Sequence, residues 1–179
     1  AKATPDCRML TIGEPDLPTP EPIKLAAMKA LEENRTHYAP NQGTLPLRTA
    51  IAAFETDRGR TTTPEEVLVT VGATQALYTA LTGILNPGDQ VIIPTPAFSL
   101  YDTITTAAGA ESVFLDVSKT DFQITRQSLA GCLTEKTKAI VLNSPCNPTG
   151  VILNRESLEA VREAVLERDL YLICDNVYN

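Results

Sequence analysis

Two short apolar runs with a helical pattern between them constrain the fold of this chain more than any other feature. The runs, residues 139–142 and 171–174, are rich in β-branched and aromatic residues. This order predicts a strand, a crossover helix and a second parallel strand. Similar runs at residues 67–71, 91–93 and 112–117 alternate with further helical patterns. The sequence therefore predicts an α/β fold of three layers, α/β/α, with helices on both faces of a mostly parallel sheet.

Polar residues follow the last two of these runs, at the point where each strand ends. Asn-Ser-Pro-Cys-Asn-Pro-Thr-Gly occupies residues 143–150, and Cys-Asp-Asn-Val-Tyr occupies residues 174–178. In open α/β sheets, ligands bind in the crevice outside the carboxyl ends of the strands. We therefore expect a ligand site that contains Asn147, Asp175 and Tyr178.

These segments resemble the pyridoxal 5'-phosphate (PLP) site of the fold-type-I, class I and II aminotransferases, in which the corresponding residues have a similar spacing. More motifs agree, in the same order along the chain: Gly13-Glu14-Pro15-Asp16, Tyr38 with Gly43 and Leu47-Arg48, the Gly-Ala-Thr-Gln-Ala-Leu run at residues 72–77, and Pro-Gly-Asp-Gln-Val-Ile-Ile-Pro at residues 87–94. The resemblance covers essentially the whole chain. It implies the PLP-dependent transferase fold, PLP as the cofactor, and a homodimer.

Two ends of the cofactor site can be argued from the residues as well as from the resemblance. Ala73 and Thr74 lie where a strand is expected to turn into a helix, and a helix N-terminus with its free N–H groups favours phosphate. Asp175 follows four apolar strand residues, where a carboxylate needs a cation or several donors. The resemblance assigns Ala73 and Thr74 to the phosphate and Asp175 to the protonated pyridine nitrogen. Taken alone, these residues also suit an ordinary helix cap and a strand-end turn.

The remaining site residues are assigned by the resemblance. Phe98 stacks on the pyridine ring, and Asn147 and Tyr178 bind the ring hydroxyl. Tyr38 reaches the cofactor phosphate of the partner subunit, and the backbone of Gly13 lies beside the substrate carboxylate. Each residue also has an ordinary alternative. Phe98 suits a core position and Asn147 a turn before Pro148. Tyr38 suits a surface loop and Gly13 a simple turn.

The lysine that forms the Schiff base in this family is not recognisable in the chain. The family's lysine lies downstream of the Asp-x-x-Tyr segment in a Ser-x-x-Lys context, and none of the six lysines, at residues 2, 24, 29, 119, 136 and 138, fits it. The family's arginine for the substrate carboxylate is also C-terminal. We therefore expect no catalytic residue in this fragment, a missing C-terminal half of the same polypeptide as its partner, residues 1–19 as an N-terminal arm, and residues 20–179 as the N-terminal portion of the PLP-binding large domain.

Two positions depart from the family pattern. Glu commonly follows the Asp, and an acidic residue commonly follows the Tyr, whereas this chain has Asn176 and Asn179. Neither position is a usual cofactor contact, so the assignments above stand.

The function implied is transfer of an amino group from an amino acid to a 2-oxo acid, with both small molecules as partners. The motifs are most similar to bacterial aminotransferases of the aromatic, aspartate and N-acetyl-diaminopimelate kinds. Two alternatives share the PLP fold: a PLP-dependent β-C–S lyase, and the non-catalytic effector domain of a transcription regulator. A product assay for pyruvate would identify the lyase, and a fused DNA-binding segment would identify the regulator.

Composition bounds the remaining classes. The net charge of −7 argues against a nucleic-acid or membrane-surface role, and no apolar run approaches the roughly 18 residues of a transmembrane helix. The four cysteines, at residues 7, 132, 146 and 174, match no metal spacing. Cys174 is interpreted as a small core residue in a reducing compartment, which favours a cytoplasmic protein.

Two geometric expectations complete the sequence analysis. The Asn147–Pro148 peptide bond should be cis, because the Asn side chain must face the ligand while the chain turns away from the sheet. In the family, two strands from beyond residue 179 lie between the strand at residues 67–71 and the strand that ends at Asp175. These two segments should therefore not pair with each other.

Overall fold

The computed structural model describes Gly13 and residues 15–178. The chain divides into two compact units, Ala1–Thr44 and Leu45–Asn179, and each is described by itself. The first unit contains α1 (Glu21–Glu32), which begins directly after Pro20. Its large apolar side chains, which include Ile23 and Leu31, are exposed. Most of the predicted N-terminal arm lies outside the described residues, so the proposed domain bounds of 1–19 and 20–179 stay a prediction.

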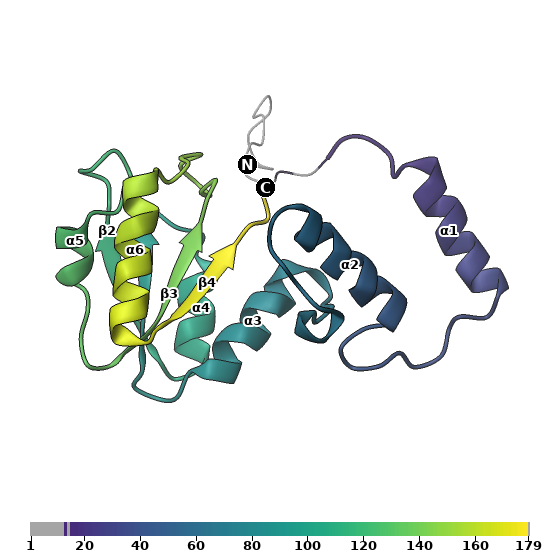
Figure 1. The fold of residues 1–179 in the computed structure, drawn as a ribbon, viewed down its shortest axis with the longest axis horizontal. Coiled ribbons are helices and arrows are strands. Elements are labelled where there is room, and N and C mark those ends of the chain that lie inside the picture. Colours follow the sequence, from purple (N-terminus) through teal and green to yellow (C-terminus); the bar gives the residue numbers. More distant parts are fainter. Residues whose placement is uncertain (1–12, 14, 179) are drawn as a thin grey trace, which may run out of the picture. The chain divides into compact units, whose positions relative to one another are not determined.

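The second unit alternates helices and strands, as the sequence predicts (Figure 1). Its elements in chain order are α2 (Leu45–Asp57), the short 3₁₀ helix η1 (Pro64–Glu66), α3 (Gly72–Ile84), β1 (Gln90–Thr95), α4 (Leu100–Ala107), β2 (Glu111–Asp116), α5 (Arg126–Ala130), β3 (Thr137–Asn143), α6 (Arg155–Arg168) and β4 (Tyr171–Asp175). The four strands are parallel and lie in the order β2-β1-β3-β4. The register brings Asn143, the last residue of β3, beside Asp175, the last residue of β4.

The core consists of two apolar clusters, one on each face of the sheet. Alternate residues of a strand point to opposite faces, so Val91 and Ile93 of β1 pack with α3 and α4, while Ile92 packs with α5 and α6. Strand β3 divides in the same way, with Val141 in the first cluster and Ile140 in the second. Each of these five side chains is at most 1% exposed, and burying one contributes about 1.5–3 kcal/mol. The three-layer α/β/α prediction is confirmed.

Helix α6 is fixed at its N-terminus by side chains from its own cap and from the loop before α5. Oδ1 of Asn154 accepts a hydrogen bond of 2.8 Å from the N–H of Ser157, and Asn is among the residues preferred at a helix N-cap. The buried hydroxyl of Ser157 accepts from the N–H of Ile124 and donates to Oε1 of Gln123. These bonds attach the connection between β2 and α5 to the helix that covers the same face of the sheet.

The prediction of a strand at residues 67–71 is wrong, because the structure has no strand there. A strand needs a neighbour to satisfy its backbone N–H and C=O groups, and this segment has no strand beside it among the described residues. It does not pair with β4, as expected. Strand β4 likewise has a neighbour only on its β3 side within the described sheet. For this reason Cys174, expected in the core, is exposed.

Candidate active site

A cavity of about 150 Å³ lies at the carboxyl ends of β3 and β4. Six of the eight predicted site residues line it: Ala73, Thr74, Phe98, Asn147, Asp175 and Tyr178. The other lining residues are Leu77, Leu100, Tyr101, Asn143 and Val177. The structure thus brings together side chains that lie more than 100 residues apart in the sequence, at the edge of the sheet where parallel α/β proteins bind ligands.

The other two predicted residues, Gly13 and Tyr38, belong to the first unit, whereas the cavity belongs to the second. Tyr38 is fully exposed, and a Cβ atom added to Gly13 would meet nothing within 4 Å. Their assignments to a partner subunit's cofactor and to the substrate stay predictions.

One wall of the cavity is the N-terminus of α3. The helix begins at Gly72, whose φ of 77° is a conformation that favours glycine. The N–H of Val71 donates to Oε1 of Gln75 at 2.6 Å, and the N–H of Gly72 donates to the carbonyl of Thr70. Ala73 and Thr74 follow in the first turn, where backbone N–H groups have no partner within the helix and the helix dipole is positive. This wall suits an anionic group such as a phosphate.

Asp175 supplies the only formal charge among the eleven described residues that line the cavity. Its Oδ2 accepts a hydrogen bond of 2.8 Å from the hydroxyl of Tyr101, and its Oδ1 accepts one of 3.2 Å from the N–H of Val177. Neither donor is a cation. A half-buried carboxylate of this kind is suited to a ligand that brings a positive charge or an N–H donor of its own.

Tyr101 is a site residue that sequence reasoning missed. It is only 2% exposed, and its ring meets that of Phe98 edge to face, with centroids 5.9 Å apart and planes at 87°. Burial raises the pKa of the Tyr101 phenol, and the hydrogen bond to Asp175 raises it further. The sequence holds one weak signal, which is that Tyr101 follows Phe98 by only three residues. Nothing in the sequence indicates its bond to Asp175.

Asn143 is the second residue that the sequence analysis did not assign. Its side-chain Nδ2 donates to the carbonyl oxygen of Asp175 at 2.9 Å, and its Oδ1 accepts from the N–H of Asn147 at 2.7 Å. The Asn147–Pro148 bond is cis, as predicted. Asn143 therefore connects the end of β3 with both polar segments that the sequence singles out.

The cavity combines four kinds of group that a single planar ligand could use. It offers helical N–H groups, a carboxylate, aromatic rings, and the amide and phenol of Asn147 and Tyr178. These groups fit a phosphorylated aromatic ring with a basic ring nitrogen and a hydroxyl substituent, which is the chemistry of PLP. The donor set that the structure assembles therefore agrees with the cofactor that the sequence implies.

Comparison with known proteins gives one consistent family. The profile described as "Aminotransferase class I and II" matches residues 5–179. The chain is 41% identical over 175 residues to the aspartate/prephenate aminotransferase of Thermus thermophilus. This match covers 97% of this chain and 46% of that protein. It is 38% identical over 176 residues to a probable N-acetyl-LL-diaminopimelate aminotransferase of Bacillus subtilis, with 97% and 45% covered.

Solved structures agree with the sequence relatives. The fold superposes on the aspartate aminotransferase of Thermus thermophilus with maleate at a TM-score of 0.90 and 42% identity, over 94% of this chain and 45% of that one. A TM-score of 0.87 and 41% identity relate it to the aromatic aminotransferase of Pyrococcus horikoshii, over 93% and 45% of the two chains. The chain thus spans about half the length of the relatives it matches.

Proposed function

We propose, from the premise that this chain belongs to the class I and II aminotransferase family, that it forms the cofactor-holding part of a PLP-dependent aminotransferase. The reaction is the transfer of an amino group from an amino acid to a 2-oxo acid. Bound PLP supplies the electron sink for this chemistry, and the protein binds, orients and tunes it. The chain covers about 45% of its relatives, so the activity of the whole protein is part of the proposal.

The single observation that carries the proposal is the composition of the cavity. The phosphate would bind the first-turn N–H groups of α3 and the hydroxyl of Thr74. Asp175 would hold the proton on the ring nitrogen, because a carboxylate close to a cation favours the charged form. Asn147 and Tyr178 would bind the ring hydroxyl, and Phe98 would pack against the ring.

Further parts of the proposal concern groups outside the cavity. Tyr38 would reach the cofactor phosphate of a second copy in a homodimer, and Gly13 would lie by the substrate carboxylate. The C-terminal part of the polypeptide would supply the Schiff-base lysine and the arginine for the substrate. Gly13 and residues 15–178 include no helix with the length and apolar character needed to cross a membrane, and a cytoplasmic location remains our proposal.

Binding of pyridoxamine 5'-phosphate by the 179-residue chain tests the cofactor site. This form of the cofactor has an amine in place of the aldehyde, so it cannot react with surface lysines. We expect Asp175→Asn to weaken binding at least tenfold, about 1.4 kcal/mol, because the amide cannot pair with the charged ring nitrogen. The matched control is Asp169→Asn, since Asp169 is exposed and has a φ of 51°, which Asn tolerates. Equal affinity of both variants and the wild type would contradict the proposal.

The amino-transfer activity can be tested in a chimera. Residues 1–179 would replace the matching 46% of the Thermus thermophilus aspartate/prephenate aminotransferase, whose remaining part contributes the segment in which the family carries its lysine. We expect the chimera to transaminate the substrates of that relative. Release of pyruvate from a β-thio amino acid without transamination would favour the lyase. A folded, PLP-binding chimera with neither activity would contradict a catalytic role.

A further inference from the structure

We propose that Tyr101 is a positioning residue whose hydroxyl holds the Asp175 carboxylate in the orientation that binds the ring nitrogen of the cofactor. The inference rests on the proposed function, because it assigns to Tyr101 an effect exerted through Asp175. It concerns a residue that the sequence analysis did not select and that reaches the site from a different layer of the fold.

The contacts of the carboxylate carry the first step. Tyr101 donates to Oδ2 of Asp175 and the N–H of Val177 donates to Oδ1. One carboxylate oxygen is therefore held from α4, and the other from the loop that follows β4. A carboxylate offers roughly four lone-pair sites. Two donors therefore fix its plane and still leave acceptor positions for a ligand. Without the Tyr101 hydroxyl, the carboxylate would keep only the bond from its own loop and could rotate.

The rigidity of Tyr101 carries the second step. Its side chain belongs to the core cluster between α3, α4 and the sheet, which also contains Leu77, Ile93 and Val141. The ring of Phe98 meets it at the cavity side, and the backbone carbonyl of Tyr101 accepts from the hydroxyl of Thr105. A phenol confined in this way presents its hydroxyl at one place, which is what orientation of a second side chain requires.

The protonation state of Tyr101 carries the third step. The phenol must keep its proton to donate to Asp175. Burial comes first among the causes that raise its pKa, followed by the hydrogen bond to Asp175 and the negative charge of that carboxylate. The hydroxyl is therefore a donor throughout the neutral range. This arrangement also explains why a tyrosine, with a hydroxyl at the end of a core ring, is suited to this position.

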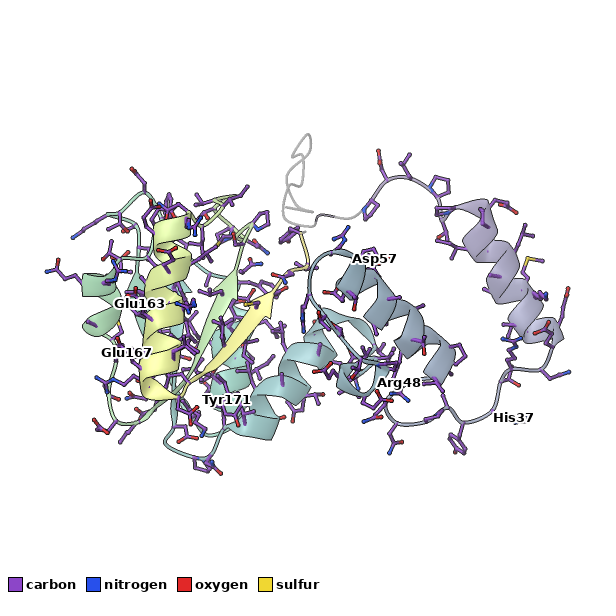
Figure 2. All side chains as sticks on the ribbon, in the orientation of Figure 1. His37, Arg48, Asp57, Glu163, Glu167 and Tyr171 are labelled. Carbon is purple, nitrogen blue, oxygen red and sulfur yellow. The ribbon has the colours of Figure 1, made fainter. Side chains whose placement is uncertain are left out.

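A double-mutant cycle separates positioning from a merely structural role. We expect Tyr101→Phe to weaken pyridoxamine 5'-phosphate binding by roughly tenfold, the effect of about one hydrogen bond to a charged group. In the Asp175→Asn background, the same change should alter affinity less than twofold, since Tyr101 acts through the carboxylate. The control is Tyr171→Phe, which also removes a phenol hydroxyl, but at the first residue of β4, at the end of the strand opposite to Asp175 (Figure 2).

The possible results distinguish the two proposals. Equal effects of Tyr101→Phe in both backgrounds, or no effect in the wild-type background, would overturn the positioning role. If Asp175→Asn leaves the affinity unchanged, the proposed cofactor site itself fails. A measurement without cofactor then still decides the pairing of the two side chains: Asp175→Asn should lower the pKa of the Tyr101 phenol in an absorbance titration, and an unchanged titration would overturn the inference.

Discussion

Asn143 accepts a hydrogen bond of 2.7 Å from the backbone N–H of Asn147 through Oδ1, and its Nδ2 donates to the carbonyl of Asp175 at 2.9 Å. One amide side chain thus joins the loop after β3 to the end of β4. Asn147 follows β3 and Asp175 ends β4, so this link connects two cavity residues that lie far apart in the sequence.

Removing the link should affect both stability and binding. We expect Asn143→Ala to lower the free energy of unfolding by about 1–3 kcal/mol, because it leaves the partly buried N–H of Asn147 without its acceptor. Pyridoxamine 5'-phosphate affinity should fall about tenfold, since Asn147 and Asp175 lose their common support. Urea unfolding and equilibrium dialysis measure the two effects. Asn176→Ala, at an exposed neighbouring position, is the control, and an Asn143 variant that behaves like it would contradict the prediction.

The phosphate end of the site predicts a difference between two ligands. Thr74→Ala removes a hydroxyl donor at the N-terminus of α3, so binding of pyridoxamine 5'-phosphate should weaken by roughly three- to tenfold. Binding of pyridoxamine, which has no phosphate, should stay the same. Calorimetry on both ligands checks this, with Thr82→Ala on the same helix as the control. A loss of the same size for both ligands would assign Thr74 to another part of the cofactor.

Alkaline pH should destabilise the chain through Tyr101. Its pKa is raised in the folded protein above the ordinary value of 10.0, so above about pH 10 the unfolded chain has lost a proton that the folded chain keeps. The free energy of unfolding is therefore unaffected by this group at lower pH and falls as pH rises above 10, by up to about 1.4 kcal/mol per pH unit. Urea unfolding between about pH 8 and about pH 11 should show a smaller decrease for Tyr101→Phe than for Tyr171→Phe. Identical decreases would contradict this account.

Hydrogen exchange should reveal the segment at residues 68–70, which has no strand beside it in the described part of the chain. Backbone amides of residues 68–70 should exchange much faster than those of Ile140 and Val141 in β3, which has a strand on each side. In the chimera described above, the added strands should slow exchange at residues 68–70. Mass spectrometry of peptic fragments measures both. Protection equal to that of β3 in the 179-residue chain would mean that the segment has a partner already.

The chain alone should not transaminate. None of its six lysines lies in the family's Ser-x-x-Lys context, so borohydride reduction in the presence of PLP should label no single lysine in parallel with turnover. Peptide mapping after reduction is the measurement, and the Thermus thermophilus relative serves as the positive control. Reproducible labelling of one lysine, together with product formation, would show that the chain carries its own reactive amine.

The sequence predicts the elements whose signals are local. The β-branched runs of β1 and β3, and the Asn154 cap of α6, are readable because strand propensity and capping depend on a few neighbouring residues. The six cavity residues are predictable because their motifs occur in a known family. The failure at residues 67–71 has a physical cause: an apolar run predicts that a segment can be a strand, but pairing needs a partner. Tyr101 and Asn143 were missed because their bonds to Asp175 join residues 74 and 32 positions apart.

Asp175 is the last residue of a strand that has a neighbour on only one side in the described sheet, and this has a consequence for how the cofactor and the rest of the polypeptide influence each other. A segment that pairs with the free side of β4 and steadies Asp175 would increase the affinity for the cofactor. Thermodynamic reciprocity then requires the cofactor to increase the affinity for that segment by the same factor. Cofactor binding and the pairing of that segment with β4 would then strengthen each other by the same coupling free energy.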